Sequence, residues 1–277
     1  MTIAELHGKL SPERPESVNE RMEDLLTSDV FGTMKYAGWD TGFWDWIKMA
    51  EVAPVSPFWP SISSLLNKNQ PLKIYFRFWP LLTNGREPDL AILAELEDGR
   101  FLIIVVEVKY FSETSDWDDD EKAEIFNLTG SQLADQVMGL SLMPIAALMK
   151  WFDIPRYARD HDMVKSHLYI TTHSVLPILD YEKAAKRMNG PWSIPSYWLS
   201  WNNLAKCLEG HLEQENSGIR ELLKDLILLL KRKGLVPFSG FGTEPLVIQT
   251  ESPYFWNESY WTIKYKKIPA YQTFFRP

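Results

Sequence analysis

Residues 87–109 have the sequence EPDLAILAELEDGRFLIIVVEVK, and this stretch decides the fold. Two apolar runs, 90–96 and 101–108, are separated by a turn that contains Asp98-Gly99. Asp-Gly between two apolar runs is a strong signal for a β-hairpin. The second run is apolar enough to be buried on both faces of a sheet. The stretch therefore predicts a hairpin at the centre of the fold.

The second strand of this hairpin ends in charged residues. Glu107 and Lys109 are two residues apart, so they lie on the same face of the strand. Buried charges are costly unless they are paired or bind a metal. The pattern indicates a functional site, and the alternative is an exposed hairpin mouth whose charges are solvated.

The length of the turn decides where Asp89 lies. A two-residue loop at 98–99 would place Leu90 opposite Glu107 and leave Asp89 on the other face. A three-residue loop at 97–99, ending in a left-handed glycine, would place Asp89 directly opposite Glu107. Two carboxylates about 5 Å apart on neighbouring strands suit a hard cation such as Mg²⁺. A lysine beside them can orient or deprotonate a water and stabilise developing negative charge.

Pro88-Asp89, followed by Glu107-Val108-Lys109 at the end of the next strand, resembles the PD-(D/E)XK nuclease superfamily, which is restriction-endonuclease-like. The resemblance implies that Asp89 and Glu107 hold Mg²⁺, for which Mn²⁺ can substitute. It also implies that Lys109 assists the water that attacks a DNA phosphodiester. Removal of Glu107 or Lys109 should then abolish cleavage and leave the fold intact. The biological roles that the resemblance implies are restriction, phage defence and DNA repair. A homodimer is also possible, because cutting both strands of DNA commonly calls for two sites.

A helix predicted at 19–26, with Ser17 as its cap, precedes the hairpin. Many nucleases of the resembled superfamily carry an acid on such a helix, directed at the same metal. Glu23 is the candidate for this third metal ligand, with Glu20 as the second choice. The alternative is that both acids complement the dipole of a first helical turn.

A second helix is predicted from Thr129 to Trp151, with Pro144 kinking or restarting it. Some members of the resembled superfamily carry a Gln-x-x-x-Tyr pair on the helix after the lysine. Gln132 matches the glutamine and is a candidate site residue, but Gln136 stands where the tyrosine would be. The alternative is that both glutamines lie on the surface.

The remaining pattern predicts an α/β fold, with a central mixed sheet flanked by helices. Further strands are expected at 72–82, 167–173 and 197–201, and further helices at 31–50, 180–185, 204–212 and 219–233. The nuclease-like core is assigned to 1–203. A C-terminal extension is assigned to 204–277, either separate or packed on the core. Its aromatic and basic tail, 238–277, suits stacking on nucleic acid, or packing onto the core or a second subunit.

Composition sets limits on these assignments. The chain has 277 residues, one cysteine and a net charge of −8, which does not favour a nucleic-acid binder, although a local basic strip can still hold phosphates. A cytoplasmic protein with no membrane span or signal peptide is expected. His167 and His173 are expected to be structural or surface residues, and 112–121 a solvated loop.

Two functions follow from these observations. The first is a metal-dependent deoxyribonuclease. The alternative is a non-catalytic nuclease-like subunit that binds or assembles within a DNA-processing complex, which the acidic balance and the aromatic tail favour. The presence of all three motif residues, Asp89, Glu107 and Lys109, argues against that alternative.

Overall fold

The structure is a computed structural model that describes residues 7, 18–66, 69–110, 128–154, 162–188 and 192–237. The chain divides into two units, Met1–Pro237 and Phe238–Pro277, and every described residue belongs to the first. The Ser17 cap, the loop at 112–121 and the aromatic tail lie outside the described residues, as does the side chain of Glu20.

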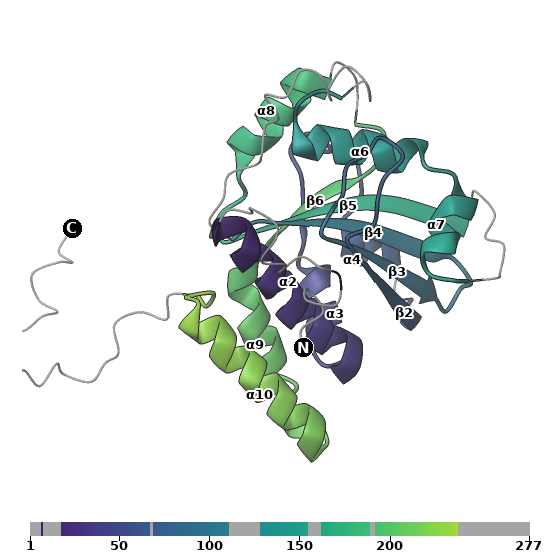
Figure 1. Cartoon of the computed structure of the whole chain (residues 1–277). Helices are drawn as coiled ribbons and strands as arrows, with labels where there is room; N and C mark the ends of the chain where they lie inside the picture. Colours follow the sequence, from purple (N-terminus) through teal and green to yellow (C-terminus); the bar gives the residue numbers. More distant parts are fainter. Residues whose placement is uncertain are drawn as a thin grey trace, which may run out of the picture. The chain divides into compact units, whose positions relative to one another are not determined.

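A six-stranded mixed sheet lies at the centre of the first unit (Figure 1). Its strands are β1 (Glu51–Val52), β2 (Pro71–Phe78), β3 (Leu90–Leu96), β4 (Phe101–Val108), β5 (Met163–Thr171) and β6 (Ser196–Ser200). They are ordered β1-β6-β5-β4-β3-β2 across the sheet. β2, β3 and β4 form an antiparallel meander, β4, β5 and β6 are parallel, and β1 is antiparallel to β6.

Helices cover both faces of this sheet, which confirms the expected α/β class (Figure 1). One face carries α6 (Gln132–Leu142), α7 (Ile145–Trp151) and α8 (Ile178–Met188). The other carries α2 (Val18–Ala37), α3 (Phe43–Lys48), α9 (Leu204–Glu209) and α10 (Ser217–Arg232). The short elements are α4 (Ile62–Leu66) and the 3₁₀ turns η2 (Trp201–Asn203) and η3 (Leu212–Gln214).

β4 is buried along its whole length, as its apolar sequence predicts. Its even-numbered residues, such as Ile104 and Val106, pack in the core beneath α2 and α10. Its odd-numbered residues, such as Ile103 and Val105, pack in the core beneath α6 and α8. Because side chains alternate along a strand, Glu107 belongs to the face that α6 covers.

Pro144 divides the predicted helix 129–151 into two helices that meet at an angle of 107°. Proline has no N–H to donate and clashes with the preceding turn, so α6 ends at Leu142 and α7 begins at Ile145. No single helix in the described ranges is long and apolar enough to cross a membrane. α6 and α7 pass that test of length and composition only as a bent pair.

The C-terminal helices pack against the helices that cover one face of the sheet. α10 lies against α2, and α9 lies against α3. Leu223, Leu226 and Leu230 supply the buried face of α10, at the spacing of an amphipathic helix. The boundary expected at residue 203 therefore falls inside the first unit, which runs to Pro237.

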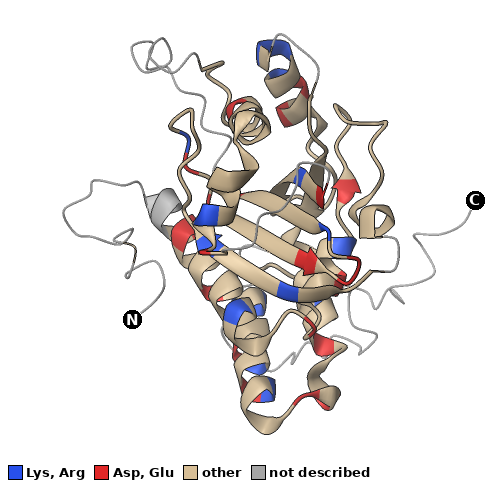
Figure 2. Ribbon diagram, turned by 90° about the vertical axis from the view of Figure 1, so that its right-hand side faces the viewer, with Lys and Arg blue, Asp and Glu red and all other residues tan. Residues whose placement is uncertain are grey.

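Charged residues are mixed in sign over the described ribbon. Figure 2 shows Lys and Arg interspersed with Asp and Glu, with no broad area of one sign. This mixture agrees with a net charge of −8 and an isoelectric point near 5.3. Within the described residues, binding of phosphates would therefore rely on a few well-placed cations or on a bound metal.

Candidate active site

The turn between β3 and β4 sets the register of the central hairpin. Gly99 has φ 83°, and its N–H donates to the carbonyl of Leu96 over 2.9 Å. Leu96 and Arg100 close the loop, and Leu90 pairs with Val106. Of the two loop lengths that the sequence allowed, the structure has the three-residue loop. One residue further along this register, Asp89 lies opposite Glu107.

The open end of the hairpin brings together four of the expected site residues. Lys109 Nζ lies 2.8 Å from Glu107 Oε1 and 3.5 Å from Glu23 Oε2, so the ammonium sits between two buried carboxylates. Asp89 is half-buried, and its Oδ2 accepts the Val108 N–H over 2.7 Å. Glu23 also accepts the Tyr110 N–H over 2.9 Å, which holds α2 at the end of β4.

A second contact fixes α2 at this position. The indole N–H of Trp79 donates to Asp24 Oδ1 over 3.1 Å, and the backbone N–H of Trp79 donates to the Asp89 carbonyl over 3.0 Å. Trp79 has φ 47°, a left-handed conformation that is strained for a bulky side chain. Such strain persists where surrounding contacts require it. Here Trp79 links Asp24 on α2 directly to the backbone of Asp89.

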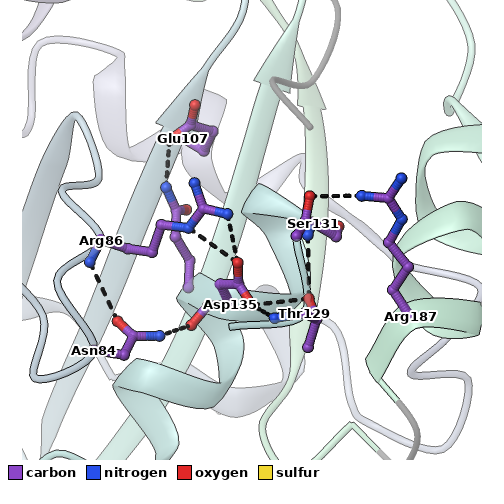
Figure 3. A network of polar contacts seen from close by, with 9 residues as sticks. Asn84, Arg86, Glu107, Thr129, Ser131, Asp135 and Arg187 are labelled. Carbon is purple, nitrogen blue, oxygen red and sulfur yellow. Dashed lines mark hydrogen bonds and ion pairs between the residues drawn. The ribbon is translucent and has the colours of Figure 1, made fainter. Parts of the chain in front are cut away.

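A buried ion pair holds the loop before Asp89 against the start of α6 (Figure 3). The guanidinium of Arg86 donates to Asp135 Oδ2, and both residues are almost fully buried. The other oxygen of Asp135 accepts the N–H of Thr129 over 2.7 Å. Asn84 donates to the Asp135 carbonyl, and its amide fills the space beside Gly139. Thr129, where the helix was expected to begin, lies before α6 and donates from both its N–H and its hydroxyl to Asp135.

The two glutamines of α6 have different surroundings. Gln136 is fully buried, and its Nε2 donates to Glu107 Oε2 over 2.6 Å. Gln132 is the first residue of α6 and is half-buried, one turn before that contact. The structure therefore places Gln136 against Glu107, and a role for Gln132 stays a prediction.

The pKa values of Asp89 and Lys109 are both raised, but by different causes. Burial and the charge of Glu107 raise the pKa of Asp89 well above its usual value. Burial opposes the charge on Lys109, but the neighbouring carboxylates of Glu107, Glu23 and Asp89 outweigh it and raise the lysine pKa. Lys109 is therefore a cation at neutral pH, suited to donate hydrogen bonds and stabilise charge. It is poorly suited to accept a proton from water.

The residues fit a Mg²⁺ ion held by few protein ligands. Three carboxyl groups, those of Glu23, Asp89 and Glu107, act on the ammonium of Lys109, and Asp24 lies near enough to Asp89 to act on its charge. Within the described ranges, no three His, Cys, Asp or Glu residues are grouped as a ready metal cage. Mg²⁺ usually keeps several waters and takes only one or two carboxylates. Asp89 and Glu107, with Glu23 beside them, could supply that set.

Asp89→Asn should raise the free energy of unfolding at neutral pH without divalent metal. In the unfolded chain the Asp89 carboxyl ionises above its usual pKa of 3.8, whereas the folded chain keeps the proton to higher pH. The stability that the protonated group provides is complete in acid and is lost as pH rises through the raised pKa. Urea denaturation from about pH 4 to about pH 8 should therefore show a growing advantage of the variant.

Asp98→Asn, in the turn of the same hairpin, is a control that should change the free energy of unfolding in the opposite direction. Slight burial raises the pKa of Asp98, but hydrogen bonds from Arg100 outweigh it and lower the pKa. Its stabilising effect is therefore present above the usual pKa and lost as pH falls. The asparagine variant should be less stable than the parent at neutral pH. If both variants shift stability in the same direction, the raised pKa of Asp89 is wrong.

Sequence reasoning did not single out three of the residues at this site. Asp24 directly follows Glu23, and its role depends on Trp79 from the end of β2. Gln136 was noted only where a tyrosine was expected, although its neighbours Leu133 and Val137 on α6 are apolar and buried. His167 had a signal of its own, since it lies within an apolar strand. It is fully buried, as the structural assignment for it allowed.

Comparison with protein-family models, with curated proteins and with solved structures finds no match to this chain. The fold and the site are therefore interpreted from their own geometry. They define an α/β domain with a carboxylate–lysine cluster at the carboxyl end of a central strand.

Proposed function

We propose that this protein is a Mg²⁺-dependent nuclease that hydrolyses DNA phosphodiester bonds, with Mn²⁺ able to substitute. The proposal includes a restriction-endonuclease-like core and the resemblance to PD-(D/E)XK nucleases carried by Asp89, Glu107 and Lys109. A role in phage defence or DNA repair rests on that resemblance alone.

One observation carries the proposal. Asp89 lies opposite Glu107 in the hairpin register, and Lys109 contacts Glu107 at the same end. An acid from the preceding helix, Glu23, reaches the same lysine. Carboxylates are the ligands that Mg²⁺ prefers, and an excess of buried carboxylates over cations is favourable where a metal binds.

Each side chain has a distinct task in this proposal. Asp89 and Glu107 would hold the cation with Glu23 as a third ligand, and Glu23 would also keep Lys109 in place. When bound, Mg²⁺ would stabilise the charge that builds on the phosphate and the leaving oxygen. The Lys109 ammonium would orient the attacking water and donate to a phosphate oxygen. Because this amine is protonated, the proton of the water must pass to another acceptor, such as solvent or the phosphate itself.

A second candidate function is a nuclease-like subunit that binds without cutting. The mixed charges of Figure 2 favour it, since a DNA-binding face usually shows a basic stripe. The two functions differ in what a divalent cation does. A nuclease binds Mg²⁺ or Mn²⁺ at the site and cuts only with it, whereas a binding subunit requires neither.

The test is incubation of the full chain with linear, circular, single-stranded and branched DNA, and with RNA. Each substrate is offered with Mg²⁺, with Mn²⁺ and with EDTA. The proposal expects cleavage of at least one DNA substrate with either metal and none with EDTA. Thermal unfolding with Mn²⁺ should also show a higher Tm, because a ligand that binds only the folded state stabilises it. Metal-independent cutting, or no cutting together with no shift in Tm, would reject it.

A further inference from the structure

A buried chain of polar side chains runs from Glu107 through α6 to β5. Gln136 Nε2 donates to Glu107 Oε2 over 2.6 Å, and Gln136 Oε1 lies 3.0 Å from His167 Nε2. Behind the imidazole, His167 Nδ1 lies 3.4 Å from Ser196 Oγ on β6. All four side chains are buried, so a polar atom left without a hydrogen-bond partner here would be costly.

The chemistry of these groups fixes the direction of every hydrogen bond. A carboxylate only accepts, so Gln136 must turn its NH₂ toward Glu107. Its carbonyl oxygen then faces His167, and that oxygen also only accepts. His167 must therefore carry its proton on Nε2 and leave Nδ1 as an acceptor for the Ser196 hydroxyl. Burial lowers the pKa of His167 to about 3, which keeps the ring neutral at neutral pH.

We infer that Gln136 and His167 are positioning residues for Glu107, and that His167 acts through Gln136. The inference rests on the proposed metal-dependent function and names residues that the sequence motif does not contain. Lys109 holds Oε1 of Glu107 and Gln136 holds Oε2, so the carboxylate is fixed from both sides. Each carboxylate oxygen has two acceptor positions, so both remain able to face a cation.

The imidazole keeps the amide in the orientation that Glu107 needs. If the amide of Gln136 turned over, its carbonyl oxygen would face a carboxylate and its NH₂ would face an N–H. Both contacts would then be repulsive, so the Nε2–H tautomer of His167 excludes that state. This arrangement resembles the way in which partners of metal ligands fix the orientation of the ligands in known metal sites.

The experiment measures Mn²⁺ affinity by calorimetry for the parent and for Gln136→Leu, His167→Leu and the double variant. Loss of a partner of a metal ligand typically weakens affinity about 10- to 100-fold. Each single variant should show a loss of that order. The double variant should be no weaker than Gln136→Leu alone, because His167 has no separate path to the site.

Two further variants separate positioning from general damage. His167→Gln keeps an N–H donor near Nε2 and should retain most of the affinity that His167→Leu loses. Ser166→Ala removes a buried hydrogen bond to the Ile103 carbonyl from the neighbouring position on β5. Ser166→Ala should lower stability without changing Mn²⁺ affinity. Equal affinity loss in Ser166→Ala and His167→Leu would overturn the inference.

A metal-free measurement keeps the inference distinct from the proposed function. Nitrogen-15 NMR of the imidazole should show a neutral ring at pH 7 with the proton on Nε2 of His167. A proton on Nδ1, or a charged ring, would overturn the inference even if the parent binds Mn²⁺. If the parent binds Mn²⁺ and the leucine variants bind equally well, the inference fails and the proposed function stands. If the parent binds no Mn²⁺, the inference and the proposed function both fail, whichever tautomer His167 adopts.

Discussion

Glu107→Gln should reduce Mg²⁺-dependent DNA cleavage by more than about 100-fold, because loss of a group that only supports a metal ligand already lowers affinity or activity about 10- to 100-fold. The substitution keeps the volume of the side chain and removes the charge that lies opposite Asp89. Initial rates of cleavage, measured on the substrate that the parent cuts best, give this ratio directly.

The fold should tolerate this substitution. Lys109 keeps the carboxylate of Glu23 at 3.5 Å, and the glutamine can still receive the NH₂ of Gln136 on its carbonyl oxygen, although its own NH₂ then faces the Lys109 ammonium and that contact is lost. Removal of the Glu107 charge also removes one cause of the raised pKa of Asp89, which then ionises more readily beside Lys109. Circular dichroism should therefore stay close to that of the parent, with a modest fall in Tm from the lost contact with Lys109.

Glu97→Gln is the matched control for the charge change. Glu97 lies in the turn at the closed end of the same hairpin and accepts the Gln70 N–H at the exposed surface. Its replacement should leave the cleavage rate within about twofold of the parent, as expected for a surface site away from the cluster. If Glu107→Gln cuts as fast as Glu97→Gln, Glu107 is not a metal ligand in the reaction and the proposed mechanism is wrong.

Lys109→Met should lower the free energy of unfolding by about 3 kcal/mol, within the range found when one partner of a buried ion pair is removed. The methionine leaves Glu107 and Glu23 buried without their shared cation. The sequence alone suggested that removal of this lysine would leave the fold intact. The buried ion pair changes that expectation, so loss of cleavage in this variant must be judged beside its stability.

Two comparisons test the cause of that destabilisation by urea denaturation without metal. Lys224→Met removes an exposed lysine that pairs with Glu221 on α10, and it should change stability by less than about 1 kcal/mol. The double variant Glu107→Gln with Lys109→Met should be more stable than Lys109→Met alone, because it leaves one fewer uncompensated charge. A loss in Lys109→Met no larger than that in Lys224→Met would show that the pair is not desolvated.

The hairpin could be predicted because its determinants are local. Gly99 allows the left-handed residue that closes a three-residue loop, and that loop length fixes the register of every pair between β3 and β4. The apolar run of β4 also indicated burial on both faces correctly. The 23 consecutive residues 87–109 limited Asp89 to two placements, and the observed three-residue loop places it opposite Glu107.

For the helices, the sequence left more alternatives open. On α2, sequence left open whether Glu23 or Glu20 faces the site, since both positions suit the first turns of a helix. On α6, Gln132 and Gln136 lie one turn apart on the same face, so helical spacing did not distinguish them. Which of the two glutamines reaches Glu107 depends on the position, or height, of α6 along the axis of β4. The Arg86–Asp135 pair and the loop at Asn84 help to set that height.

The sequence by itself determined the central hairpin, limited it to two registers, and placed two acids and an amine near its open end. These features depend on alternation along strands and on one turn, which act over a few residues. Only the tertiary structure decided that Glu23, Gln136 and His167 complete the cluster. Their contacts join positions as far as 87 residues apart, Glu23 to Tyr110, and they form where helices from opposite faces reach the end of β4. Local patterns carry no information on such packing, because it depends on how whole elements dock.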